Sequence, residues 1–231
     1  MAPENTMAAF LRADRERADM VELDVRLSQD AELVVFHDRR LGRTAPGRKR
    51  IRDVSSAALR GLDAGGWFGS RFVGEPIPAL REVLHRLPQR TGVNVEVKTD
   101  GDRARRPLLA SRLVALLRLE RRRLLVSSFD HTFLKVFREL GTGIPTGALY
   151  MAVRDLRIRP SVLGRRTGAS TFICSSAQLR KRYCRDAGRH GMTVLVYGVN
   201  TGRQLRRAAR LGADGVITDV PRLIRSLVSQ L

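Results

Sequence analysis

Short runs of β-branched and other apolar residues alternate along this chain with longer segments of helical spacing, and this alternation limits the fold more than any other feature. Seven runs are predicted to be strands, and they cover residues 20–25, 93–97, 124–128, 146–150, 171–174, 193–199 and 215–218. Strands that alternate with helices are typical of βα units around a parallel sheet. The order therefore favours an α/β fold.

Helical segments are predicted between and after these strands. They cover residues 108–119, 132–140, 177–190, 203–211 and 221–231. In 203–211 the arginines at 203, 206, 207 and 210 share one helical face, which predicts a solvated outer face. A short strand over 33–36 is expected to turn back on 20–25, and the Arg-, Gly- and Ser-rich stretch 38–78 is expected to be an insertion after it. A length of 231 residues suits a single domain, 1–231.

The charge of the chain is strongly basic. Lys and Arg together number 43 against 23 Asp and Glu, a formal net charge of +20, and only Lys49, Lys98, Lys135 and Lys181 are lysines. An arginine excess can mark a surface for phosphates, lipid head groups or nucleic acid, or it can reflect codon usage. The arginines are scattered along the whole chain, which favours codon usage.

Two further features bear on where such a protein works. Its two cysteines, Cys174 and Cys184, match neither a CxxC pair nor a zinc site, so they are expected to be buried thiols. No apolar run approaches the roughly 18 residues of a membrane span, and the N-terminus lacks the apolar core of a signal peptide. We therefore expect a soluble, cytoplasmic protein.

Three carboxylates are predicted to converge. Residues two apart in a strand point to one face, so Glu22 and Asp24 project together, and Glu96 and Lys98 do the same on the next βα strand. Two unit charges about 4 Å apart repel by roughly 4 kcal/mol at an effective dielectric constant of about 20. Such a cluster needs a cation, a proton or a lysine, and hard oxygen ligands favour Ca²⁺ or Mg²⁺ over zinc. The alternative is that arginines satisfy the three carboxylates separately.

A histidine ends the short strand over 33–36. His37 is followed by Asp38, and a histidine at this place can donate or accept a proton near neutral pH. A lone histidine is more often structural, so both interpretations stay open on the residues alone. For His131, an adequate structural account is that Asp130 or Thr132 caps the following helix.

A series of short motifs resembles the glycerophosphodiester phosphodiesterase family in order and spacing. The motifs are Pro3-Glu4-Asn5-Thr6, Ala18-Asp19-Met20-Val21-Glu22-Leu23-Asp24-Val25, Val34-Val35-Phe36-His37-Asp38, Ile77-Pro78-Ala79-Leu80-Arg81-Glu82, Glu96-Val97-Lys98, Ser128-Phe129-Asp130 and Ile217-Thr218-Asp219-Val220-Pro221. The resemblance runs over nearly the whole chain. It implies an α/β fold of the TIM (β/α)8-barrel type, and a metal-dependent hydrolase that cleaves glycerophosphodiesters to glycerol 3-phosphate and an alcohol.

The resemblance also implies roles for single residues. Glu22, Asp24 and Glu96 would hold a divalent metal ion, Ca²⁺ or Mg²⁺, and His37 would be one of two acid/base histidines. Lys98 would lie close to the phosphate, and Phe129 would be part of the pocket wall. The expected partner is a small-molecule glycerophosphodiester, with no nucleic acid.

The chain departs from the family pattern in two places. The family's His-Arg-Gly motif, which carries the other histidine and a phosphate-binding arginine, precedes Pro-Glu-Asn-Thr and is not in this sequence. We therefore expect a barrel without its first strand, from a misplaced start site or a fragment. The family usually has Trp-Thr before Val-Asn, where this chain has Tyr197 and Gly198 before Val199 and Asn200. Tyr197 and Asn200 are expected to contact substrate.

Two hypotheses follow. The first is an active metal-dependent phosphodiesterase whose N-terminus is incompletely represented here, and whose hydrolysis is expected to be impaired as written because one acid/base histidine is absent. The second is a catalytically weak or inactive barrel that binds anionic phosphate ligands, lipid head groups or nucleic acid. The carboxylates and His37 favour the first, because a binder of anions gains nothing from clustered acids.

Overall fold

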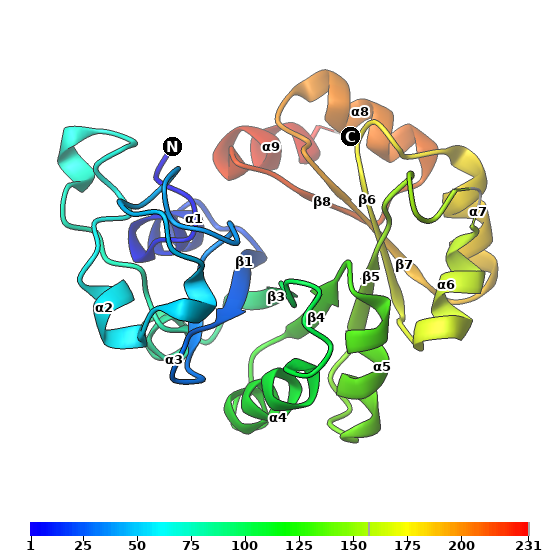
Figure 1. Cartoon of the computed structure of the whole chain (residues 1–231). Helices are drawn as coiled ribbons and strands as arrows, with labels where there is room; N and C mark the ends of the chain where they lie inside the picture. The colour runs from blue at the N-terminus through cyan, green and yellow to red at the C-terminus, as the bar shows by residue number, and fades with distance from the viewer. Residues whose placement is uncertain (157, 231) are drawn as a thin grey trace. The chain divides into compact units, whose positions relative to one another are not determined.

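The computed structural model describes residues 1–156 and 158–230. By its internal contacts the chain divides into two compact units, Met1–Leu124 and Leu125–Leu231. Each unit is described by itself, and a single domain over 1–231 stays a prediction. Figure 1 shows the elements in chain order by colour.

Three strands form the sheet of the first unit. They are β1 (Met20–Leu27), β2 (Leu33–Val35) and β3 (Gly92–Val97). β1 pairs with β2 in antiparallel and with β3 in parallel orientation. The short strand thus turns back on β1 as predicted. The helices are α1 (Met7–Arg15), α2 (Ser56–Arg60), α3 (Leu80–Arg86) and α4 (Arg106–Leu117).

Among the described residues, α1 is the first element and β1 the first strand. The side chain of Thr6 caps α1 by accepting a hydrogen bond from the backbone N–H of Ala9 at 3.3 Å. Contacts between α1 and β1 join the start of the chain to the first strand. The residues just before α1 are therefore held against the strand that carries Glu22 and Asp24.

The stretch 38–78 forms no strand and shares an apolar cluster with Val34 of β2 and with Phe36. It contains the 3₁₀ turns η1 (Ile51–Asp53) and η2 (Ser70–Phe72) besides α2. Ile51, Leu59 and Ile77 are fully buried there, and they belong to one cluster with Phe36 at the end of β2. Burying a side chain of this kind contributes about 1.5–3 kcal/mol. The insertion is therefore a packed layer that is anchored beside His37.

The second unit contains five parallel strands in sequence order. They are β4 (Leu124–Ser128), β5 (Thr146–Leu149), β6 (Thr171–Ser175), β7 (Thr193–Tyr197) and β8 (Gly215–Ile217). The helices are α5 (His131–Glu139), α6 (Pro160–Thr167), α7 (Lys181–Arg189), α8 (Gly202–Leu211) and α9 (Pro221–Val228). Neighbouring strands pair in parallel, and helices α6, α7 and α8 lie on one side of β5, β6 and β7 (Figure 1).

The structure confirms the α/β alternation. Each predicted strand coincides with an observed one, with ends shifted by two residues at most, as in β1 and β7. Helices α1, α2, α3 and α6 are additional to the predicted ones. No helix in the described part of the chain has the length and apolar character needed to cross a membrane.

Candidate active site

Three carboxylates gather where β1 and β3 run side by side. In β1, Val21, Leu23 and Val25 are buried, while Glu22 and Asp24 alternate with them. The register places Asp24 directly opposite Glu96 of β3. Glu22, Asp24 and Glu96 each offer one carboxylate oxygen, and these oxygens lie within 4.8 Å of one another. The predicted convergence is present within the first unit.

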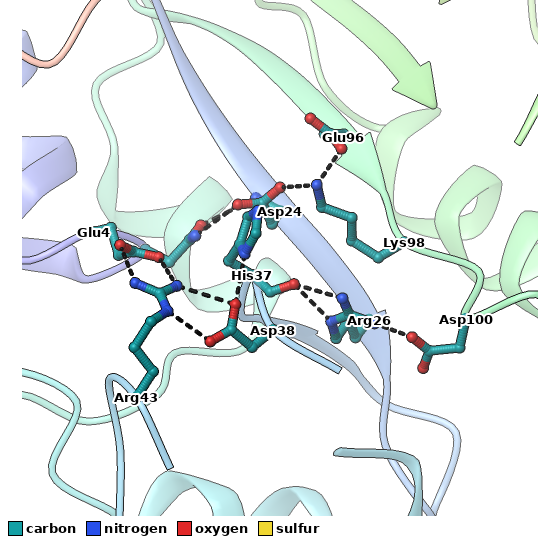
Figure 2. A network of polar contacts seen from close by, with 10 residues as sticks. Glu4, Asp24, Arg26, His37, Asp38, Arg43, Glu96, Lys98 and Asp100 are labelled. Carbon is teal, nitrogen blue, oxygen red and sulfur yellow. Dashed lines mark hydrogen bonds and ion pairs between the residues drawn. The ribbon is translucent and has the colours of Figure 1, made fainter. Parts of the chain in front are cut away.

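Lys98 lies between two of these carboxylates (Figure 2). Its Nζ is 3.0 Å from Oδ1 of Asp24, and it also donates to Oε1 of Glu96. Burial opposes the charge of Lys98, yet the charges of Asp24 and Glu96 outweigh burial and raise its pKa. Burial raises the pKa of Glu96, against the attraction of Lys98. The lysine thus supplies one of the positive charges that such a cluster requires.

Asn5 fixes the orientation of Asp24. Its Nδ2 donates to Oδ2 of Asp24 at 2.8 Å, and its Oδ1 accepts from the backbone N–H of Asp24 at 3.0 Å. Asn5 has a φ of 56°, in the left-handed region, which asparagine tolerates better than most residues. The side chain therefore holds both the backbone and the carboxylate of Asp24 in one position.

His37 follows β2 and presents an accessible ring. Its Nδ1 is 2.7 Å from Oδ1 of Asp38, and its side chain is 51% exposed. Its backbone oxygen accepts from Nε of Arg26 at 3.0 Å, and Arg26 also donates to Asp100 (Figure 2). With Nδ1 directed to Asp38, Nε2 is the atom of the ring that remains for a substrate.

Asp38 is itself held by Arg43. Nε of Arg43 donates to Oδ2 of Asp38 at 2.7 Å, and its two terminal nitrogens donate to the carboxylate of Glu4 at 2.8 and 2.6 Å. The hydrogen bond from Arg43 lowers the pKa of Asp38 to about 2. Asp38 therefore stays ionised beside His37 at all but very acidic pH.

The donor set fits a hard divalent cation. Three carboxylate oxygens from one face leave further coordination positions for water or substrate oxygens, as is common for Mg²⁺ and Ca²⁺ sites. The described residues that form this cluster include no cysteine or histidine ligand, so a zinc site is disfavoured. The arrangement is a candidate metal centre with His37 just beyond the end of the neighbouring strand β2.

Three other predicted site residues belong to the second unit. Phe129 follows β4, Tyr197 ends β7, and Asn200 lies just beyond β7. The Nδ2 of Asn200 donates to Asp219 at 2.6 Å, and its Oδ1 accepts from Thr218 and from the backbone of Asp219. These contacts join the ends of β7 and β8. A role in substrate binding for the three residues stays a prediction.

Sequence reasoning did not assign roles to several residues that surround the site. Asn5 holds Asp24, and Arg26 holds the backbone of His37. Arg43 holds the carboxylate of Asp38. Asn5 lies in a motif that the resemblance already contained, which was the one available signal for it. The sequence contained no signal that singled out Arg26 or Arg43, because arginines occur throughout the chain.

The structure shows Asp130, one of the two expected residues, as the cap of the helix that begins at His131. Asp130 caps α5 by accepting from the N–H groups of Thr132 and Phe133 at 3.1 Å. The Nε2 of His131 lies 3.0 Å from the backbone oxygen of Leu149, and burial lowers the pKa of this histidine.

Comparison with known proteins places the chain in a family. The model of the glycerophosphoryl diester phosphodiesterase family matches residues 1–223. A glycerophosphodiester phosphodiesterase of Caldanaerobacter subterraneus is 31% identical over 98% of this chain and 92% of its own length.

Solved structures agree. A phosphodiesterase of Oleispira antarctica in complex with the product sn-glycerol-3-phosphate has a TM-score of 0.89 at 29% identity, covering 99% of this chain and 92% of that chain. A glycerophosphodiester phosphodiesterase of Agrobacterium tumefaciens has a TM-score of 0.83 at 30% identity, covering 98% of this chain and 94% of that chain. The expected fold class, an α/β fold of the TIM-barrel type, is confirmed. The chain belongs to the glycerophosphoryl diester phosphodiesterase family.

Proposed function

We propose that this chain is a metal-dependent hydrolase that cleaves glycerophosphodiesters to glycerol 3-phosphate and an alcohol. The observation that carries the proposal is the convergence of Glu22, Asp24 and Glu96 within 4.8 Å. Their match to the family motifs adds to it, and so does the product bound to the Oleispira relative. A cluster of acids has no use in a protein that only binds anions, which argues against the inactive alternative.

Glu22, Asp24 and Glu96 would hold the ion, Ca²⁺ or Mg²⁺. Such an ion lowers the pKa of an attacking hydroxyl and offsets charge on the phosphoryl oxygens. Asn5 keeps the carboxylate of Asp24 turned toward this place. The side chain of Asp24 is 7% exposed and that of Glu96 is 12% exposed, so their charges are poorly screened by water.

His37 is proposed to move a proton between the entering or leaving oxygen and its Nε2. Asp38 fixes the other ring nitrogen at 2.7 Å, which sets the orientation of the imidazole. Lys98 is proposed to approach a phosphate oxygen. In the net reaction a water oxygen forms a new bond to phosphorus and gives up a proton, while the bond from phosphorus to the alcohol oxygen breaks and the alcohol leaves with a proton. Phe129, Tyr197 and Asn200 are proposed to contact the substrate.

The test is the release of glycerol 3-phosphate from glycerophosphocholine. We expect release in the presence of Mg²⁺ or Ca²⁺, loss of release after chelation, and recovery when the ion is restored. Glu96→Gln removes one charged ligand with little change in shape, and it is expected to lose activity while remaining folded by circular dichroism. The proposal is wrong if the folded wild-type protein releases no product with either ion.

A further inference from the structure

The loop that follows β5 in the second unit exposes a group of aliphatic side chains. They are Met151, Val153 and Leu156, which together are called the apolar tip. Leu156 is 69% exposed, and Val153, at 94%, is the most exposed large apolar residue in the part of the chain that the structure describes. Single apolar residues on a surface are ordinary, whereas several gathered in one loop mark a contact with a partner or a membrane.

Hydrogen bonds beneath the apolar tip hold the loop in place. Asp155 is buried, and its Oδ2 accepts from the backbone N–H of Met151 at 2.8 Å. Nε of Arg154 donates to Oδ1 of Asp155 at 2.8 Å, and Nη1 of Arg154 donates to the backbone oxygen of Phe129 at 2.5 Å. The carboxylate of the loop thus lies inside while its aliphatic side chains face water, the reverse of the usual order.

The first turn of α7 brings cations to the start of this loop. β5 and β6 pair in parallel, so the loops that follow them leave the same edge of the sheet (Figure 1). The hydroxyl oxygens of Tyr150 and Tyr183 lie 3.1 Å apart, which joins the end of β5 to α7. Cζ of Arg182 lies 5.3 Å from the centroid of the Tyr183 ring. Lys181 and Arg182 are both exposed.

The surface around the apolar tip is basic. Arg154, Arg159, Arg165 and Arg166 are exposed, and the one acidic residue in the sequence from 150 to 167 is the buried Asp155. An anionic partner is favoured by this charge. A second copy of the chain is disfavoured, because each copy carries a formal net charge of +20.

We propose that the apolar tip and the first turn of α7 dock on the face of a lipid bilayer that contains anionic phospholipids. The aliphatic side chains of the tip enter the boundary between head groups and acyl chains, and Lys181 and Arg182 meet lipid phosphates. A nucleic acid would match the cations but offers no apolar layer for Val153 and Leu156. The inference goes beyond the proposed function, and its test needs no turnover.

Binding is measured by sedimentation of the wild-type protein with vesicles. One set contains phosphatidylcholine and phosphatidylglycerol in equal parts, and the other contains phosphatidylcholine alone. We expect binding to the anionic set to be about tenfold or more tighter, and to weaken as NaCl rises from about 0.1 M to about 0.5 M. Equal binding to both sets, or binding to neither, would overturn the proposal.

Leu156→Ser tests the apolar contribution. We expect the concentration of anionic lipid at half-maximal binding to rise about fivefold or more. Leu119→Ser is the matched control, because Leu119 is 77% exposed and belongs to the first unit. It should leave that concentration within about twofold of the wild type. An equal response of the two variants would contradict docking through the tip.

A double substitution tests the charges. Lys181→Gln with Arg182→Gln is expected to weaken binding to anionic vesicles about fivefold or more. Arg48→Gln with Lys49→Gln removes the same two charges from another exposed pair and controls for net charge. If both double variants lose the same affinity, the binding reflects the overall charge of the protein, and the proposed surface is refuted.

Insertion can be observed directly because Trp67 is the only tryptophan of the chain. Leu156→Trp in a Trp67→Phe background places the reporter in the apolar tip, and Leu119→Trp in the same background is the control. We expect lipids with brominated acyl chains to quench the first and not the second. Quenching of neither, or of both equally, would overturn the proposal.

The other occupants give distinct results. A dimer that Leu156→Ser separates, together with no quenching by lipid, would assign the apolar tip to self-association and refute the bilayer. Binding to duplex DNA that is tighter than binding to anionic vesicles and insensitive to Leu156→Ser would assign the cations to nucleic acid and refute it as well.

Discussion

Replacing Asn5 with glycine is expected to weaken metal binding without changing kcat at saturating metal. The substitution removes two hydrogen bonds. One is the 2.8 Å bond from Nδ2 of Asn5 to Oδ2 of Asp24, and the other is the 3.0 Å bond from the backbone N–H of Asp24 to Oδ1 of Asn5. A hydrogen bond to a charged group is worth about 1.5–3 kcal/mol, and each 1.4 kcal/mol is about tenfold in an equilibrium constant. Loss of a partner behind a metal ligand typically costs about 10- to 100-fold in affinity. We therefore expect the half-saturating Mg²⁺ concentration to rise by about 10- to 100-fold, with kcat at saturating Mg²⁺ close to that of the wild type.

Glycine is chosen because the backbone of Asn5 is left-handed, with a φ of 56°. Glycine adopts this conformation without strain, whereas alanine is disfavoured there by about 1–2 kcal/mol. Asn5→Ala is the matched comparison, since it removes the same hydrogen bonds and adds backbone strain. Asn5→Ala should have a half-saturating Mg²⁺ concentration similar to that of Asn5→Gly, and a lower melting temperature than Asn5→Gly. Activity against Mg²⁺ concentration decides the question, and a half-saturation for Asn5→Gly within twofold of the wild type would refute the reasoning.

Three further results are expected. His37→Ala should lower turnover of glycerophosphocholine by about 10²- to 10⁴-fold in a folded protein, and unchanged turnover would exclude His37 as the group that moves the proton. The pKa of Asp38 is lowered from 3.8 to about 2, so its contribution to stability is complete above about pH 4 and is lost as the pH falls toward 2. The melting temperatures of wild type and Asp38→Asn should accordingly converge near pH 2, and a constant difference between them would argue against the ion pair. Burial raises the pKa of Cys174 to about 12 and the side chain is fully buried, so a thiol reagent at pH 8 should label Cys174 only after unfolding.

The sequence predicted the strands well because their signal is local. Runs such as 124–128 are rich in apolar and β-branched residues, and the observed β4 has the same bounds. Helix α6 was missed because it begins at Pro160 and contains Gly164. A side chain at Gly164 would lie 2.8 Å from the sulfur of Met192, so that glycine serves a tertiary contact that no local pattern records.

The outer face of α8 was only partly described by its pattern. Four arginines share that face, and solvent contact was predicted for all of them. Arg207 instead donates to the backbone oxygens of Ser176 and Leu179 at 2.5 and 3.1 Å. An arginine that satisfies carbonyl groups of a neighbouring loop has the same sequence signature as a solvated one.

The site shows the same division between local and long-range information. The two-residue period of β1 was enough to bring Glu22 and Asp24 to one face, and the pairing of Asp24 with Glu96 followed once β3 lay beside β1. The contacts of Asn5 with Asp24 and of Arg43 with Glu4 span 19 and 39 residues. Such contacts depend on how the start of the chain and the insertion fold, which the spacing of residues does not reveal.

The most direct test of the central claim is phosphorus NMR of glycerophosphocholine incubated with the wild-type protein and with Asp24→Asn. The claim predicts that the substrate signal is replaced by that of glycerol 3-phosphate in the wild-type sample with Mg²⁺ or Ca²⁺. No conversion is expected after chelation, nor with Asp24→Asn. Conversion that continues in the chelated sample, or that Asp24→Asn leaves intact, would contradict a metal-dependent phosphodiesterase centred on these carboxylates.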